Sequence, residues 1–306
     1  MRAKVVLLVS LLALPAAALA ATGSTPRVVA KIAIGLGPCS ETPGFGALWV
    51  GVNGSAIVAR IDPRTNRVTK RIPVRQGPCG IAVGAGAVWV DGYGTGTIER
   101  IDPKRLKVTA RVRVSAATTL WDVTFGAGAV WGTDSVLGYV IRLDPHTLRV
   151  KRIKTGGLPS NLRYGAGALW VGSQGGTTMY RIDPVTDAVT SIDVKQQSPD
   201  SPAVSSHAVW VANRLSNSVT RIDPSTNSVV ATIPVGMNPT NPAIAPDGTV
   251  YVPLTGEGKV AWIDPATNKV GGKIAVGPGP YPAAEAFGDI WVPASRGTQV
   301  YRIHPG

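Results

Sequence analysis

The sequence predicts an all-β fold, a seven-bladed β-propeller with four strands in each blade. The first observation is a period, because an aromatic residue stands 13 positions before an Asp-Pro or His-Pro pair seven times. The second is the spacing, since successive units are offset by 39 to 42 residues. A repeat near 40 residues built from short strands is typical of propeller blades. The aromatic residues are Trp49, Trp89, Trp131, Trp170, Trp210, Tyr251 and Trp291, and their partners are Asp62, Asp102, Asp144, Asp183, Asp223, Asp264 and His304.

The third observation is the pattern inside one unit, which is clearest in blade 2. Four β-rich runs, at residues 80–84, 87–91, 97–102 and 108–114, are separated by Gly-rich or Pro-containing turns. The run around Trp89 is apolar on both faces of the strand. That pattern suits a strand covered on both sides by neighbouring blades, and not a sheet with one wet face.

The two ends of the chain predict how the ring closes. Residues 28–34 read like a fourth strand, whereas the chain stops at residue 306, directly after a third strand. We therefore expect the N-terminal strand to complete the last blade and to leave no free edge at the seam.

The extreme N-terminus reads as a secretory signal. Arg2 and Lys4 precede an apolar stretch at residues 5–14, which is too short to span a bilayer, and Ala18 and Ala20 fit the small-residue cleavage rule. We predict a signal peptide at 1–20 and one propeller domain at 21–306. The mature protein is expected to be secreted, periplasmic or otherwise at the cell envelope, without a transmembrane anchor and as a monomer.

The repeated residues have structural interpretations. Trp side chains supply the large wedges that pack between blades, and Asp-Pro pairs are turn formers. An Arg stands two positions before most of these pairs, which suggests a structural Arg–Asp ladder and not a ligand site. Specific chemistry is therefore expected where the blades differ.

Two stretches resemble known families. Trp210-Val211-Ala212-Asn213, followed by Val219-Thr220-Arg221-Ile222-Asp223-Pro224, resembles the YVTN-type β-propeller repeat. Gly77-Pro78-Cys79-Gly80-Ile81-Ala82-Val83-Gly84 is similar to the repeat of streptogramin (virginiamycin B) lyases. The resemblance covers residues 28–305 and rests on repeated structural residues, so it is specific for fold and weak for function.

The lyase resemblance implies C–O elimination in a cyclic depsipeptide, with Mg and a His general base in a Pro-His-Gly-Ile context. The matching positions hold no His; they hold Cys39, Cys79, Trp121, Ser160, Asp200, Thr240 and Tyr281. His146, His207 and His304 fall in turns expected on the opposite face. General base catalysis by His therefore has no candidate at the mouth. We predict no cofactor, and Mg is implied only under the lyase alternative.

The loops around one end of the channel carry the candidate ligand site. Loops before the first strand and between the second and third strands share this face, and there the blades differ. A polar ligand would meet carboxylates, guanidinium groups and aromatic rings around a concave mouth, although ordinary solvated loops are the alternative. Three of the carboxylates would also suit a cation, but no compact ligand loop is present, so no metal site is predicted. The candidates are Asp91, Tyr93, Trp121, Asp122, Asp134, Asn161, Asp200, Arg214, Glu257, Tyr281 and Arg296.

Positive charge is concentrated in one third of the chain. Residues 60–154 hold 17 basic and 7 acidic residues, a net charge of +10, whereas the rest of the mature chain is nearly balanced. Most of these Lys and Arg lie in or beside outer strands of the first three blades. One interpretation is protection of exposed edges, and the other is docking to an anionic envelope polymer. Sequence-specific nucleic-acid recognition is disfavoured because aromatic residues for base stacking are missing.

Cys39 and Cys79 are the only cysteines, and both occupy a Gly-Pro-Cys position in consecutive blades. Equivalent strand ends lie side by side around the mouth, and export favours disulfides. We predict that the two cysteines are paired; free thiols or a thiolate nucleophile are the alternatives.

The function that this sequence favours is non-catalytic binding or scaffolding at the cell envelope, with an unidentified ligand or protein at the channel mouth. A lyase-like enzyme diverged at its catalytic His is the alternative, and a quinoprotein-type dehydrogenase is weaker because nothing indicates a quinone site.

Overall fold

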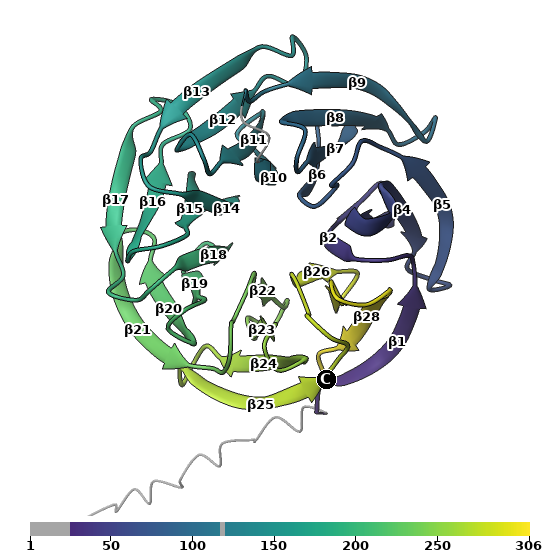
Figure 1. The fold of residues 1–306 in the computed structure, drawn as a ribbon. Coiled ribbons are helices and arrows are strands. Elements are labelled where there is room, and N and C mark those ends of the chain that lie inside the picture. Colours follow the sequence, from purple (N-terminus) through teal and green to yellow (C-terminus); the bar gives the residue numbers. More distant parts are fainter. Residues whose placement is uncertain (1–24, 117–119) are drawn as a thin grey trace, which may run out of the picture.

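The computed structural model describes residues 25–116 and 120–306. Seven antiparallel four-stranded sheets are arranged in a ring around a central channel, so the predicted seven-bladed propeller is confirmed (Figure 1). The predicted signal peptide lies outside the described residues. No helix among the described residues is long and apolar enough to cross a membrane.

Each of blades 1 to 6 is a meander that runs outward from the channel. Blade 1 contains β2 (Pro38–Gly44), β3 (Ala47–Val52), β4 (Ile57–Asp62) and β5 (Arg67–Pro73). Blade 2 contains β6 (Ile81–Gly84), β7 (Ala87–Gly92), β8 (Thr97–Asp102) and β9 (Lys107–Arg113). Blade 3 contains β10 (Leu120–Gly126), β11 (Ala129–Asp134), β12 (Tyr139–Leu143) and β13 (Val150–Lys154). A short 3₁₀ turn, η1 (Asn53–Ser55), follows β3.

The remaining blades continue the pattern. Blade 4 contains β14 (Pro159–Gly165), β15 (Ala168–Ser173), β16 (Thr178–Ile182) and β17 (Val189–Asp193). Blade 5 contains β18 (Pro199–Val204), β19 (Val209–Asn213), β20 (Ser218–Asp223) and β21 (Ser228–Pro234). Blade 6 contains β22 (Ala243–Ile244), β23 (Val250–Leu254), β24 (Lys259–Asp264) and β25 (Lys269–Ala275).

Blade 7 joins the two ends of the chain. Its strands are β26 (Ala284–Ala286), β27 (Asp289–Pro293), β28 (Gln299–His304) and, as the outer strand, β1 (Arg27–Ala33). β1 pairs antiparallel with β28, from Arg27 opposite His304 to Ala33 opposite Gln299. Figure 1 shows the two strands side by side at the seam. The predicted closure is therefore confirmed, and no strand edge is open there.

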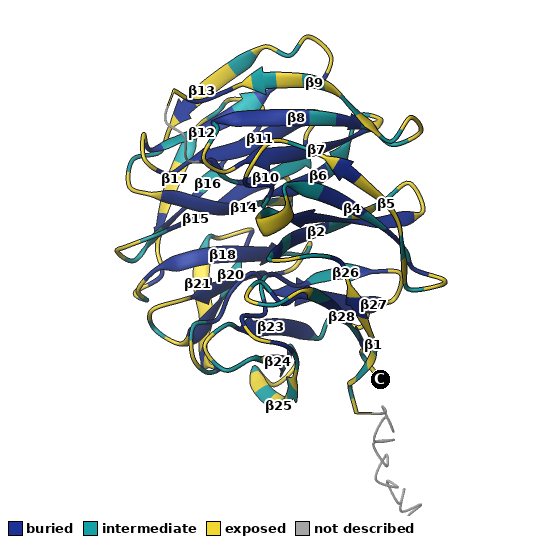
Figure 2. Ribbon diagram, turned by 45° about the vertical axis from the view of Figure 1, so that its right-hand side comes forward, coloured by how far each residue is buried: buried dark blue, intermediate teal, exposed yellow. Residues whose placement is uncertain are grey.

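The aromatic residues of the repeat are wedges between blades. Trp49 of blade 1 packs with Val88, Val90 and Ile101 of blade 2, and it is fully buried. The last wedge closes the ring, because Trp291 of blade 7 packs with Leu48 of blade 1. Second strands are buried throughout, whereas outer strands expose alternate residues (Figure 2).

In the six repeats that carry it, the Arg residue pairs with the Trp and not with the Asp of its own strand, which corrects the predicted ladder. The Arg60 guanidinium lies 5.9 Å from the Trp49 ring centroid, and five other blades repeat the arrangement at 4.9 to 5.9 Å. Arg302 also donates to Pro63 O at 2.6 Å and Asn66 Oδ1 at 2.9 Å, across the seam. The Asp instead caps its turn: Asp62 Oδ1 accepts from Arg64 N, and this hydrogen bond lowers the pKa of Asp62.

The closure predicts that β1 is required for a stable ring. Deleting residues 21–35 should cause aggregation or a large loss of melting temperature, since it exposes the edge of β28 and removes Ile32 and Ile34 from the core. Deleting residues 21–24 alone is the control, and it should change neither the solubility nor the melting temperature. Thermal melting and size-exclusion chromatography measure both effects, and a soluble, unchanged 21–35 deletion would show that closure does not depend on β1.

Candidate functional site

In six of the blades that the structure describes, all except blade 3, two loops on one face are tied together in a pair. The backbone N–H after a second strand donates to the carbonyl of the loop that precedes the first strand. Examples are Tyr93 N to Gly77 O at 2.9 Å and Ser295 N to Gly279 O at 2.8 Å. These bonds place the predicted variable loops on a common rim around the channel mouth.

A cavity of about 210 Å³ opens at this mouth. Three of the predicted residues line it, namely Tyr93, Trp121 and Tyr281, together with Asn53 and the two cysteines. The rings of Tyr93 and Trp121 meet edge to face, with centroids 5.9 Å apart. Trp121 Nε1 is buried and has no hydrogen-bond partner among the described residues. The cavity is therefore lined mainly by aromatic rings.

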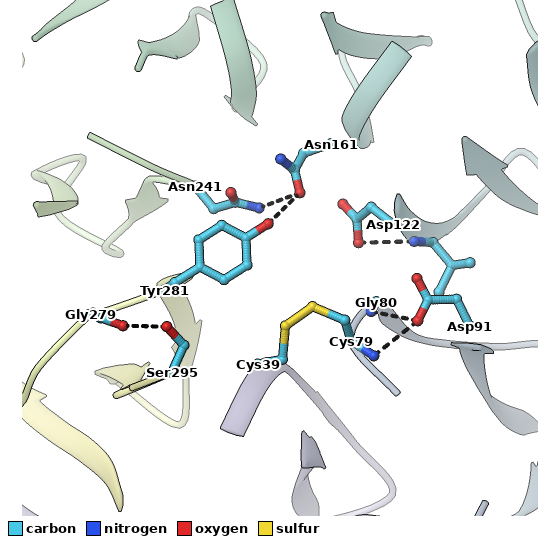
Figure 3. Close-up of a disulfide and its surroundings, with 11 residues drawn as sticks. Cys39, Cys79, Gly80, Asp91, Asp122, Asn161, Asn241, Gly279, Tyr281 and Ser295 are labelled. Atoms are coloured by element: carbon cyan, nitrogen blue, oxygen red, sulfur yellow. Dashed lines mark hydrogen bonds between the residues drawn. A yellow bond between two sulfur atoms is a disulfide. The ribbon is translucent and has the colours of Figure 1, made fainter. Parts of the chain in front are cut away.

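The cysteines form the predicted disulfide, with Cα atoms 5.0 Å apart. The bridge joins β2 of blade 1 to the segment just before β6 of blade 2 and lies in the cavity wall, near Tyr281 (Figure 3). Directly beneath it, Cys79 N and Gly80 N donate to Asp91 Oδ1 at 3.0 and 2.9 Å. Asp91 is buried, and burial raises its pKa well above the ordinary value, with the nearby Asp122 adding to the effect.

A hydrogen-bonded layer crosses the channel below the cavity. Asn161 Oδ1 accepts from Tyr281 Oη at 3.0 Å and from Asn241 Nδ2 at 3.1 Å, which connects blades 4, 6 and 7 (Figure 3). Asn161 Nδ2 donates to Ser201 Oγ at 2.9 Å, and Ser201 Oγ donates to Asn241 Oδ1 at 2.7 Å. Burial is the main cause that raises the pKa of the Tyr281 hydroxyl, so this hydroxyl stays a donor.

Two predicted carboxylates belong to this layer and not to an open site. Asp122 Oδ2 accepts from Arg163 Nη1 at 2.6 Å, in an ion pair whose carboxylate is buried and whose Arg side chain is 30% exposed. The backbone carbonyl of Asp200 accepts from Ser160 Oγ at 2.9 Å, and burial raises the pKa of the Asp200 carboxyl. These groups therefore belong to the channel wall.

The other predicted residues do not line the cavity. Asp134 accepts from Ser115 Oγ and, at 3.0 Å, from Leu137 N, so it orders its own loop. Glu257 pairs with Lys273 at 2.9 Å. Arg214 and Arg296 contribute backbone N–H groups to the paired loops, donating to Ser198 O and Pro278 O. In the part of the chain that the structure describes, no three His, Cys, Asp or Glu residues are grouped to hold a metal.

The histidines lie away from the mouth. His146 follows β12, His304 ends β28, and His207 precedes β19, all at turns of the opposite face. His304 Nδ1 is 2.7 Å from Asp289 Oδ1, and His207 Nδ1 is 2.7 Å from Ser206 Oγ. None of the three lines the mouth cavity.

Sequence reasoning missed Asn53, Asn241, Ser201 and Arg163. Arg163 carried a usable signal, because the equivalent position in the other blades holds only Thr or Ala. Asn241 directly follows Thr240 and Ser201 directly follows Asp200, one position after the residues that align with the lyase His. Asn53 had no signal, since its place in the wall depends on the turn η1.

The match to known families is partial. A family model described as a repeat of unknown function, DUF6923, matches residues 79–175, which span blades 2 and 3 and enter blade 4. The matched model is thus not the YVTN repeat that the sequence resembles. No curated protein matches the chain.

The fold is similar to several solved propellers. A streptogramin B lyase matches with a TM-score of 0.81 and 15% identity, over 91% of this chain and 97% of that chain. Virginiamycin B lyase from Staphylococcus aureus matches with a TM-score of 0.80 and 15% identity, over 91% of this chain and 99% of that chain. The WD40 propeller domain of Doa1 matches with a TM-score of 0.79 and 9% identity, over 92% of this chain and 97% of that chain. At these identities the likeness shows a shared fold alone.

The disulfide should contribute strongly to stability. Replacing both Cys39 and Cys79 by Ser reopens a loop of 40 residues and should lower the free energy of unfolding by about 3–4 kcal/mol on the chain-entropy account. Denaturant unfolding measures this loss, and wild-type protein in reductant is the control that should reproduce it. Two alkylatable thiols in oxidised wild-type protein, or unchanged unfolding of the double variant, would contradict the assignment.

Proposed function

We propose that the protein is an exported binding propeller of the cell envelope, which takes an aromatic or apolar group of its ligand into the mouth cavity and performs no chemistry there. The observation that carries the proposal is the cavity itself. Tyr93, Trp121 and Tyr281 surround it, and aromatic side chains dominate binding energetics at such sites. The disulfide and the predicted signal peptide both fit an oxidising compartment.

The rim around the cavity supports a ligand larger than one ring. Several loop tips of the mouth face expose large apolar side chains, and grouped exposed apolar residues are typical of interaction surfaces. They are Leu36, Val136, Leu137, Leu158, Leu215 and Met237. A peptide-like partner would place one side chain in the cavity and rest on these tips.

The alternative is a diverged lyase, favoured only by the likeness in fold to the streptogramin lyases. Acid–base catalysis needs a titratable group within reach of the substrate. The residues that line the mouth cavity include no carboxylate and no His. Asp91 and Asp200 are buried beneath it and are engaged with the backbone or with neighbouring polar groups.

Binding of N-acetyl-L-tryptophanamide, an uncharged aromatic peptide analogue, tests the cavity. Saturation-transfer NMR should detect it on wild type, and Trp121→Ala should weaken binding about tenfold or more, since losing a central aromatic contact typically costs 1–3 kcal/mol. Tyr164→Ala removes an exposed tyrosine at the other end of the channel and is the matched control. Equal binding to all three proteins, or none to wild type, would contradict the proposal, and conversion of quinupristin to a linear product would establish the lyase instead.

The basic outer strands of blades 1 to 3 are proposed as a second contact surface, for an anionic envelope polymer. Lys70, Arg71 and Lys107 are exposed on β5 and β9. Arg111 is different, because it pairs at 2.8 Å with Glu99, which is buried. Edge protection accounts for exposed Lys and Arg as well, so binding has to be measured.

Charge reversal separates these interpretations. Changing Lys70, Arg71 and Lys107 to Glu should weaken binding to dextran sulfate, and wild-type affinity should fall steeply with salt. Reversal of Arg27, Lys259 and Lys269 on blades 6 and 7 is the matched control and should have a smaller effect. Salt-independent binding, or equal losses in both triple variants, would leave only edge protection.

A further inference from the structure

Blade 6 departs from the repeat at two positions that face each other. The other six blades place a Trp on the second strand opposite an Arg on the third, with the guanidinium 4.9 to 5.9 Å from the ring centroid. In blade 6 the paired residues are Tyr251 on β23 and Trp262 on β24. An aromatic side chain therefore stands where the other blades carry a guanidinium.

The Arg of other blades can also bind the neighbouring blade. Arg221 donates to Pro265 O at 2.8 Å and to Asn268 Oδ1 at 2.9 Å, in the turn between the third and fourth strands of blade 6. Arg302 binds the corresponding turn of blade 1 in the same way. Blade 6 itself faces blade 7, whose third and fourth strands, β28 and β1, come from opposite ends of the described chain and are not joined by a turn. The junction of blades 6 and 7 therefore differs from the others on both sides.

The Trp262 indole lies against the backbone of β25. A side chain at Gly271 or Gly272 would collide with the ring, whereas the equivalent positions of β5 hold Thr69 and Lys70. The two glycines thus give the indole room to rest on the outer strand. Trp262 remains half-buried, and the surface that it leaves uncovered lines a cavity.

This junction cavity has a volume of about 320 Å³. It is bounded by Trp262, Asp247 and Thr249 of blade 6 on one side, and on the other by the two chain segments that flank blade 7, residues 25–26 and 305–306. Cavities of this size accommodate a small ligand. No Lys, Arg or His among the described residues lines it.

Asp247 gives the cavity an accessible carboxylate. The residue is exposed, and its Oδ1 and Oδ2 accept from Thr249 N and Thr249 Oγ1, both at 2.9 Å. These bonds fix the carboxylate and leave about half of its lone-pair positions open. Tyr251 forms the buried base of the cavity and donates from Oη to Pro305 O at 3.3 Å. Burial raises the pKa of Tyr251 to about 12, and the charge of Asp247 adds to the effect, so this charge acts on the cavity.

An aromatic surface beside a carboxylate is the chemistry that recognises an organic cation. A guanidinium group suits it because it is planar, stacks on aromatic rings and pairs with a carboxylate through its N–H groups. Six blades of this protein already place a guanidinium against a Trp ring. An anion, in contrast, would be repelled by Asp247.

We propose that the junction cavity binds a small guanidinium compound of the arginine class, with the planar cation on the uncovered surface of the Trp262 indole and paired with the Asp247 carboxylate.

Two compounds that differ in one group test the charge requirement. L-argininamide carries the guanidinium, and L-citrullinamide carries a neutral urea in its place. In an NMR titration that follows the indole N–H signals, L-argininamide should shift the Trp262 signal and bind about fivefold or more tightly than L-citrullinamide, because the urea loses both the cation–π contact and the ion pair. Equal affinities, no shift of Trp262, or a shift confined to Trp121 at the mouth would each overturn the proposal.

Trp262→Arg restores the residue type of the other six blades and should place an internal guanidinium in the cavity. Isothermal titration should then show L-argininamide binding at least about fivefold more weakly than to wild type. The same variant assigns the Trp262 indole signal by its absence, and its melting temperature shows whether it is folded. Undiminished binding of L-argininamide to the folded variant would overturn the proposal.

Asp247→Asn tests the ion pair without filling the cavity, because asparagine keeps the size of the side chain and can still accept from Thr249 N. L-argininamide should bind this variant about two- to fivefold more weakly, as expected for an exposed ion pair. Asp193→Asn on blade 4 removes the same charge from another exposed Asp and is the matched control, which should bind like wild type. Equal affinities of the two variants would remove Asp247 from the site and overturn the assignment.

Discussion

The packing of an aromatic side chain between each blade and the next is the constraint on which the rest of the structure depends. The blades are joined around the ring mainly by such side-chain contacts, so each wedge determines the spacing and tilt of its neighbour. The wedge is itself held in place, because Trp49 Nε1 donates to Gly44 O at 2.9 Å and Trp291 Nε1 donates to Ala286 O at 2.9 Å. Arg302 then reaches from blade 7 to the turn of blade 1. The same repeated unit therefore makes the strands, the interblade core and the closing contacts.

The mouth cavity depends on closure of the ring, because the cavity lies across the junction between blade 7 and blade 1. Its walls come from blades 1, 2, 3 and 7, and Tyr281 of blade 7 lies near the disulfide that joins blades 1 and 2. Tyr281 is held from the far side of the channel by Asn161, which is 120 residues away in sequence. The repeated aromatic side chains between blades thus fix the geometry of the ring, and this geometry brings residues that differ between blades together at the mouth.

The parts of the structure that follow from local sequence signals could be predicted. Turn residues predicted β8 at its observed bounds, and they placed β9 within one residue, since its observed start is Lys107. The disulfide was predictable because Cys39 and Cys79 occupy the same position of adjacent repeats. The aromatic lining by Tyr93, Trp121 and Tyr281 followed from the same alignment of repeats. The partner of Arg60 could not be predicted in this way. Arg60 stands two positions before Asp62 on the same strand, but it also lies opposite Trp49 on the neighbouring strand.

Contacts across the channel were beyond sequence reasoning. Whether Asn161 reaches Asn241 and Tyr281 depends on the radius of the ring and on side-chain length, and no local pattern encodes either. Asp122 and Asp200 read as open-loop carboxylates, but their burial at the start of first strands makes them part of the wall. Glu41 and Arg163 differ in residue type from the equivalent positions of the other blades, but only the structure places both at the wall of the channel.

Native-state hydrogen exchange of the β1 amides tests the central claim, that the N-terminal strand is an integral part of a ring closed at blade 7. If it is, the hydrogen-bonded amides of β1 should exchange as slowly as those of β5, the outer strand of blade 1, because both are paired along their length. Exchange of β1 amides orders of magnitude faster than those of β5 would show a strand that detaches independently, and would contradict the account.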